Sequence, residues 1–128
     1  MKKFTLLMAT ALASLTLLSS CGSQSNDAKN YAIYPTKNMW TFVKLDTRNG
    51  MMWQMQFTLK DEAGYRYATE LSSYDLNFTG PKNKAGRYEL HETQNMFNFI
   101  LLDTYTGRSW QVQWSTDADK RGIIAEIE

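Results

Sequence analysis

Hydrophobic and polar residues alternate along most of this chain, and outside the first 20 residues no stretch keeps a 3.6-residue apolar period. Alternation over short runs is typical of β-strands with one buried face. Clusters of Gly, Asp, Asn and Pro separate the runs and mark turns. We expect strands at 31–35, 39–45, 51–59, 65–71, 87–92, 96–102, 108–115 and 122–127, with 74–78 as a further short candidate. The pattern predicts an all-β protein.

The pattern also repeats at an offset of 57 residues, so that 38–57 matches 95–114. Each copy contains an apolar strand, an Asp-Thr-x-x-Gly turn and a strand that alternates aromatic residues with glutamine. We interpret the match as a duplication that produced units 31–72 and 87–128, joined by the Gly/Pro/Lys-rich segment 73–86. A meander of about four strands does not bury its apolar face alone. The two tandem antiparallel meander units should therefore pack together, as a sandwich or a small curled barrel, within a single β domain at 31–128.

Alternation predicts which residues share a face. Trp110, Val112 and Trp114 lie on one side of their strand, and Trp53, Met55 and Phe57 lie on one side of the matching strand. The glutamines of both strands should lie on the opposite, polar side. In the preceding strand of the second copy, Phe97, Phe99 and Leu101 point one way and Ile100 and Leu102 the other, which predicts burial on both sides. The first copy has Lys44 where the second has Leu101, so one flank of it should be wetter.

The same physical properties of aspartate and glycine explain both Asp-Thr-x-x-Gly turns. Asp46 and Asp103 can accept hydrogen bonds from the backbone that follows them, and Gly50 and Gly107 can adopt a positive φ without steric cost. Turns of this spacing fit hairpin loops of four or five residues. We therefore assign these four residues a structural role.

The first 20 residues have the pattern of an export signal, with Lys2 and Lys3 before an apolar stretch from 4 to 17. The sequence Leu18-Ser-Ser-Cys21 resembles the lipobox of bacterial lipoproteins, which implies cleavage before Cys21 and lipid attachment to it. An ordinary signal peptide that leaves a free thiol is the alternative. Residues 21–30 are small and polar and read as a flexible tether. Gly22, in place of Asp, resembles an outer-membrane address, with the domain facing the periplasm of the bacterial cell envelope.

Composition and charge limit the classes of partner that the protein can bind. Hydrophobic residues make up 43% of the chain and aromatic residues 13%, which is enough for a globular core. Removal of the signal with its two lysines leaves 108 residues, with 12 basic and 13 acidic side chains and a net charge of −1. This balance gives no basis for nucleic-acid binding. Cys21 is the single cysteine, so no intrachain disulfide forms, and we expect the lipid to make the membrane contact.

The sequence offers little material for catalysis. His91 is the single histidine and aligns with Tyr34, so we expect no transition-metal site. The Asp46 and Asp103 carboxylates are explained by their turns, and Asp117 and Asp119 read as a solvated turn without calcium-loop spacing. We predict no catalytic residues, no metal and no cofactor.

The glutamines support a binding hypothesis. Amides beside aromatic rings suit hydroxyl-rich ligands such as glycans, since amides donate and accept hydrogen bonds while rings cover sugar faces. The ligand-binding set of this hypothesis comprises Gln54, Gln56, Gln111 and Gln113. The alternative is that glutamine simply occupies outward-facing strand positions.

Two resemblances rest on the repeated motif. Leu-Asp-Thr-x-x-Gly-x-x-Trp, at 45–53 and 102–110, continues into Gln-x-Gln and is similar to small duplicated lipoproteins of Bacteroidota, whose function is unassigned. The stretch 103–110 also resembles a blade motif of quinoprotein-like β-propellers, although the first copy departs from it at Asn49. Two units do not close a propeller, so that resemblance implies either oligomerisation or shared turn physics, and we favour the second.

These observations predict a lipid-anchored, non-enzymatic envelope domain that binds a protein or glycan partner or has a structural role. An inhibitor of a hydrolase is a variant of this hypothesis. An accessory subunit of an outer-membrane complex is an alternative that predicts an exposed apolar patch or an unpaired edge strand. An enzyme with an unrecognised carboxylate pair would instead require a deep pocket with converging carboxylates.

Overall fold

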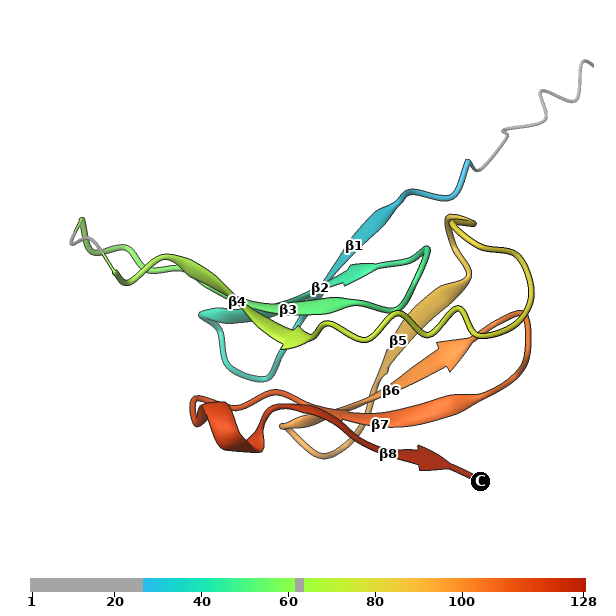
Figure 1. Ribbon diagram of the computed structural model, residues 1–128. Helices are drawn as coiled ribbons and strands as arrows, with labels where there is room; N and C mark the ends of the chain where they lie inside the picture. The colour runs from blue at the N-terminus through green and yellow to red at the C-terminus, as the bar shows by residue number, and fades with distance from the viewer. Residues whose placement is uncertain (1–26, 62–63) are drawn as a thin grey trace, which may run out of the picture.

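The structure is a computed structural model that describes residues 27–61 and 64–128, and these form two four-stranded antiparallel sheets. The first sheet contains β1 (Tyr31–Pro35), β2 (Thr41–Asp46), β3 (Met52–Gln56) and β4 (Tyr67–Ser72). The second contains β5 (Tyr88–Glu92), β6 (Asn98–Asp103), β7 (Ser109–Gln113) and β8 (Gly122–Ile127), with a short 3₁₀ turn, η1 (Ala118–Lys120), before β8. The predicted all-β class with two meander units is confirmed. Figure 1 shows the two sheets as separate layers.

The registers of the two sheets follow the duplication. Lys44 pairs with Trp53 in the first sheet, and its counterpart Leu101 pairs with Trp110 in the second. Each turn closes through the glycine amide, with Gly50 N donating to Asp46 O at 3.0 Å and Gly107 N donating to Asp103 O at 2.8 Å. The φ angles of the two glycines are +82° and +78°. The duplication therefore extends from the sequence to the hydrogen-bond pattern.

The segment between the sheets contains no strand, so the candidate strand at 74–78 was wrong. This segment has no neighbouring strand to pair with and is instead fixed to the first turn. Leu76 N donates to Asn49 O at 2.9 Å, and Asn77 Nδ2 donates to Arg48 O at 2.8 Å. The predicted signal peptide, Cys21 and most of the predicted tether lie outside the described residues.

The hydrophobic core lies between the sheets, where β2 approaches β5 and β4 approaches β8. Both sheets contribute to one cluster of buried side chains: Val43, Leu45, Met52, Leu71, Leu76, Tyr88, Leu90, Phe99, Leu101, Trp110, Val112 and Trp114. Neither meander has a second layer of its own. The contact between the sheets is therefore what gives each of them a buried face.

The inner face of the first sheet differs from the one predicted. Met52 and Gln54 face the core with no exposed surface, and Trp53 and Met55 are half-buried on the opposite side. In the second sheet the predicted face is the inner one, since Trp110, Val112 and Trp114 are all buried. The cause is that the sheets pack through non-equivalent sides, which alternation within one strand does not reveal.

The expected two-sided burial of the strand at 96–102 was also wrong. Phe99 and Leu101 are buried, whereas Ile100 is 37% exposed and Leu102 is half-buried. A two-layer arrangement covers one side of each sheet, so the other side of β6 remains accessible.

Candidate functional site

The four glutamines proposed as a ligand-binding set do not line one face. Gln54 is enclosed between the sheets, where its Oε1 accepts a hydrogen bond from Ser115 N at 3.1 Å. Gln56 accepts from the Tyr67 hydroxyl at 2.8 Å at the far end of the first sheet.

Gln111 and Gln113 are half-buried on the outer side of the second sheet. Their amides donate to Asn98 Oδ1 and to Lys120 O, each at 2.8 Å. The prediction of a single amide surface is therefore wrong. Gln54 and Gln111 are equivalent in the repeat, but Gln54 lies on the inner side of its sheet and Gln111 on the outer side of the other.

The first sheet instead presents an aromatic surface to the outside. This outer aromatic face consists of five half-buried or exposed residues on one side of β2, β3 and their flanks: Trp40, Phe42, Trp53, Met55 and Phe57. The Phe57 ring lies 5.3 Å from the Trp40 ring and 5.8 Å from the Phe42 ring, centroid to centroid. Aromatic rings at these separations attract one another and stabilise the arrangement.

A shallow, mainly apolar groove of about 250 Å³ crosses this face. Phe42, Met55, Gln56 and Phe57 line one part of it, and Tyr67 and Ala68 line the other. Phe57 and Tyr67 are each 40% exposed. The groove offers apolar contact area, the Tyr67 hydroxyl and the Gln56 amide, and the hydroxyl already donates to Gln56 Oε1.

Lys44 adds a positive charge to the outer aromatic face. Its Nζ lies 4.6 Å from the centre of the Trp53 ring and 5.9 Å from that of Tyr31. An ammonium over an aromatic ring is held by the ring quadrupole while it remains partly solvated. Lys44 replaces the buried Leu101 of the second repeat, and this replacement was the one sequence signal that the first sheet has a wetter side.

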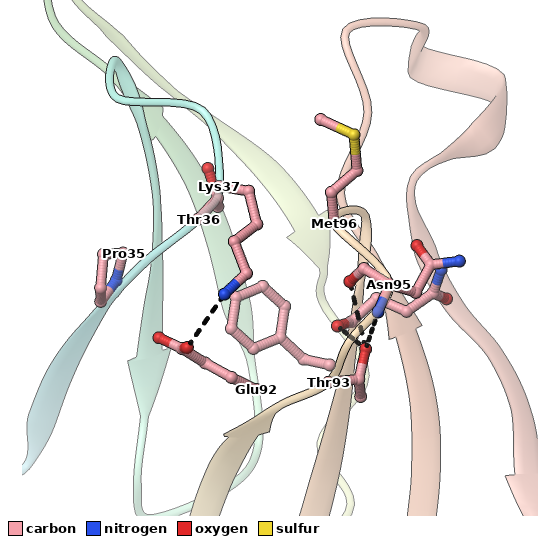
Figure 2. A pocket seen from close by; sticks show the side chains of 9 residues that line it. Pro35, Thr36, Lys37, Glu92, Thr93, Asn95 and Met96 are labelled. Atoms are coloured by element: carbon pink, nitrogen blue, oxygen red, sulfur yellow. Dashed lines mark hydrogen bonds and ion pairs between the residues drawn. The ribbon is translucent and has the colours of Figure 1, made fainter.

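A second, smaller cleft lies between the repeats where the equivalent β1–β2 and β5–β6 turns meet. Figure 2 shows Lys37 and Glu92 pointing toward one another across it, with Nζ and Oε2 3.8 Å apart. Thr36 and Thr93 donate to the backbone oxygens of Thr41 and Asn98, both at 2.8 Å. The cleft has a volume of about 70 Å³.

The strongest electrostatic contact is a buried ion pair at the second turn. Arg87 Nε and Nη2 donate to the two Asp103 carboxylate oxygens at 3.0 and 2.8 Å, and both side chains are almost fully enclosed. Arg87 also donates to Pro81 O at 2.9 Å and to Thr79 O at 2.6 Å. The guanidinium thus ties the linker to the second sheet.

Burial alone would raise the pKa of Asp103. The hydrogen bonds from Arg87, from the Thr106 hydroxyl and from the Tyr105 and Thr106 amides outweigh burial and lower that pKa to about 2. The hydrogen bond to Asp103 raises the pKa of Arg87 against the opposing effect of burial. A carboxylate that is ionised and already bonded on both oxygens is a poor proton acceptor, so Asp103 has a structural role.

Asp46, the equivalent carboxylate, has a more accessible partner. Arg48 Nη2 lies 2.8 Å from Asp46 Oδ2, and the Arg48 side chain is 30% exposed. Burial opposes ionisation of Asp46, but the Arg48 and Asn49 hydrogen bonds lower its pKa below the ordinary value. Each turn carboxylate therefore has an arginine partner, two residues away for Asp46 and 16 residues away for Asp103.

The remaining charged candidates are surface residues. His91 Nε2 lies 3.4 Å from Glu89 Oε2, and both side chains are about half exposed. Asp117 caps η1, accepting from Asp119 N at 3.0 Å. Across 27–61 and 64–128, no cluster of three or more His, Cys, Asp or Glu residues could hold a metal ion.

The described part of the chain is thus an all-β domain with two similar sheet units and an apolar face on the first of them. None of its helical segments is long and apolar enough to cross a membrane. Comparisons with protein families, with curated protein sequences and with solved structures find no match to this chain.

Proposed function

We propose that this protein is a non-catalytic, lipid-anchored domain of the bacterial cell envelope that holds a protein partner on its outer aromatic face. The observation that carries the proposal is the unequal environment of equivalent residues. Trp110 and Trp114 are 5% and 2% exposed, whereas their counterparts Trp53 and Phe57 are half-buried and 40% exposed. A surface with the composition of a core is a typical protein-binding surface.

The chemistry of the face favours a protein over a glycan. Glycan sites combine rings with several unpaired hydrogen-bonding groups, whereas Gln54 lies in the core and the carbonyl oxygen of Gln56 already accepts from the Tyr67 hydroxyl. Aromatic and methionine side chains are enriched where proteins meet. An accessory-subunit role therefore fits better than a sugar-binding role.

The lipid anchor is supported by the N-terminal sequence, with its short apolar stretch and Leu-Ser-Ser-Cys21. A lipid on Cys21 would hold the domain at the outer membrane through the polar residues that precede Tyr31. The Cys21→Ser variant should move from the membrane fraction to the soluble fraction of lysed cells. Continued membrane fractionation of this variant would contradict the anchor, whatever the outcome for the aromatic face.

Photo-crosslinking in living cells tests the binding surface. A photoreactive phenylalanine analogue at position 44, within the outer aromatic face, should give a protein adduct of defined mass after irradiation. The same analogue at position 59 is the matched control, since Leu59 is 82% exposed, follows the end of β3 and does not line the groove. The proposal fails if position 44 gives no adduct, or gives the same adducts as position 59.

A further inference from the structure

The two sheets pack through opposite sides of the same repeated unit. The first sheet contributes Val43, Leu45, Met52 and Gln54 to the interface, and the second contributes Phe99, Leu101, Trp110, Val112 and Trp114. At an offset of 57 residues, none of the first group is the counterpart of any of the second. The contact between the repeats is therefore heterologous, with one side of the unit packed against the other side of the next.

A heterologous contact leaves one side of each terminal unit uncovered. The outer face of the first sheet carries the counterparts of the buried second-sheet residues: Phe42, Lys44, Trp53, Met55 and Phe57. The outer face of the second sheet carries the counterparts of Val43, Leu45, Met52 and Gln54, which are Ile100, Leu102, Ser109 and Gln111. The molecule thus exposes the two halves of an interface that it already makes internally.

The turns give independent support. The first turn is covered by the linker and the start of the second repeat, where Gly86 N donates to Thr47 Oγ1 at 3.0 Å and Tyr88 N donates to Thr47 O at 2.9 Å. A Cβ atom on Gly50 would lie 2.8 Å from Leu76 Cδ1 and 3.4 Å from Tyr88 Cδ1.

The linker contacts the second turn at Tyr105, against which Gly80 packs, but the glycine of this turn lacks such cover. A Cβ atom on Gly107 would meet no atom within 4 Å. Tyr31, the counterpart of the fully buried Tyr88, is 50% exposed and lies beside Lys44 on the outer side of the first sheet. The turn and the tyrosine that would cover it are therefore both present in one chain, in different sheets.

We propose that the partner of the outer aromatic face is a second copy of this chain, which docks head to tail through the outer face of its second sheet. This inference rests on the proposed function and names its partner. In such a contact Tyr31 of one copy covers the 103–107 turn of the other, as Tyr88 covers the 46–50 turn within one chain. The contact repeats at every added copy, so the assembly is a ring or an open filament.

Two of the differences between the outer faces and the internal pair are charges. Lys44 stands where the second sheet has Leu101, and Glu89 stands where the first sheet has Ala32. These two substitutions are opposite in sign and lie on the two faces that would meet, which favours their contact. The outer aromatic face also carries Glu70, the neighbour of Trp53 on β4, so Lys44 is the group on this face that can attract Glu89.

A mixing experiment separates a head-to-tail contact from a two-fold one. The Met55→Lys substitution places a charge on the outer aromatic face, and Ile100→Lys places one on the outer face of the second sheet. Each should raise the dissociation constant by about 30-fold or more, as loss of a central interface residue does. Leu59→Lys, an apolar-to-lysine change in the β3–β4 loop and outside the strands of both faces, is the matched control.

The measurement is the mass of the full chain in mild detergent by light scattering, with the detergent contribution subtracted. The wild-type chain and Leu59→Lys should form multimers, and each face variant alone should be a monomer. An equimolar mixture of the two face variants should give dimers, because the intact first-sheet face of one fits the intact second-sheet face of the other. Circular dichroism should show the same fold in all four proteins.

Three results would overturn the inference: a monomeric wild-type chain, face variants that still form multimers, or a mixture that remains monomeric. The crosslinking test distinguishes this failure from failure of the proposed function. An adduct between position 44 and a different protein would defeat self-association and leave the binding function standing. Absence of any adduct at position 44 would defeat both.

Discussion

Replacement of Asp103 by asparagine should destabilise the protein through Arg87. The Arg87 side chain is 1% exposed, and loss of the carboxylate leaves its charge balanced by backbone oxygens alone. Removal of one member of a buried ion pair costs about 3–5 kcal/mol, mostly from the uncompensated charge that remains. We therefore expect Asp103→Asn to lower the free energy of unfolding by about 3 kcal/mol at pH 7.

The acid dependence gives a second magnitude from the same residue. The pKa of Asp103 is about 2 in the folded protein, compared with an ordinary value of 3.8. Because the folded pKa is the lower one, its contribution is complete above about pH 5 and is lost as the pH falls toward 2. The difference corresponds to about 2 kcal/mol of wild-type stability. The Asp103→Asn variant should lack this component of acid sensitivity.

The assay is urea unfolding followed by tryptophan fluorescence at pH 7, 5, 3 and 2. Asp46→Asn is the matched control, since Arg48 is 30% exposed and can be solvated when its partner is lost. That variant should lose about 1 kcal/mol or less. Equal losses for the two variants, or an Asp103→Asn protein that keeps the full wild-type acid dependence, would refute the reasoning.

Three further predictions use matched positions. Gly50→Ala should lower the free energy of unfolding more than Gly107→Ala does. Both substitutions force alanine to a φ near +80°, which costs about 1–2 kcal/mol, but a Cβ atom at position 50 also collides with Leu76. Equal shifts of the thermal midpoint would contradict this packing. Gln54→Leu should lower the free energy of unfolding by about 1–3 kcal/mol in urea, because Ser115 N loses its buried acceptor. Gln113→Leu should change it by no more than about 0.5 kcal/mol, since its hydrogen bond to Lys120 O is exposed. Similar effects of the two substitutions would refute the structural role of Gln54. Tyr88→Phe removes the hydroxyl that lies 3.1 Å from Asn77 Oδ1 and should cost about 1 kcal/mol, whereas Tyr67→Phe, at an exposed hydrogen bond, should cost less by the same assay.

The strands were largely predictable because their signals are local. Alternation and turn residues identified all eight, and the predicted bounds of β1 and β8 agree with the structure. The candidate strand at 74–78 failed because a short alternating run forms a strand only with a partner. Leu76 and Asn77 instead bind the first turn, a contact with no local signature.

The inner face of each sheet was not predictable, because it depends on how the repeats stack. Trp53 and Trp110 occupy equivalent positions with the same side chain, yet Trp110 is buried and Trp53 is half-buried on the outside. Both sides of β2 carry apolar residues, so burial energy alone does not select one. The replacement of Leu101 of the second repeat by Lys44 in the first was the one sequence signal that marked the outer side.

The role of Arg87 was hidden by the duplication itself. Comparison of the repeats draws attention to shared residues, and Arg87 aligns with Asn30, which has no charge. Its partner Asp103 and its carbonyl acceptors at Thr79 and Pro81 come together when the linker folds back. Arg87, like Lys44, is a charged residue where the other repeat has an uncharged one, and this difference was the sequence signal for the contact.

The order of the strands has a consequence for folding kinetics. In both sheets of the described chain each strand pairs with its neighbour in sequence. Such pairings close short loops, and local contacts form rapidly because little chain entropy is lost before they are made. A lone meander gains little stability, so we expect hairpins to form and dissolve until the linker closes on the first turn. The rate-limiting step should then be docking of one sheet on the other, with Asn77 and Arg87 ordered late in the transition.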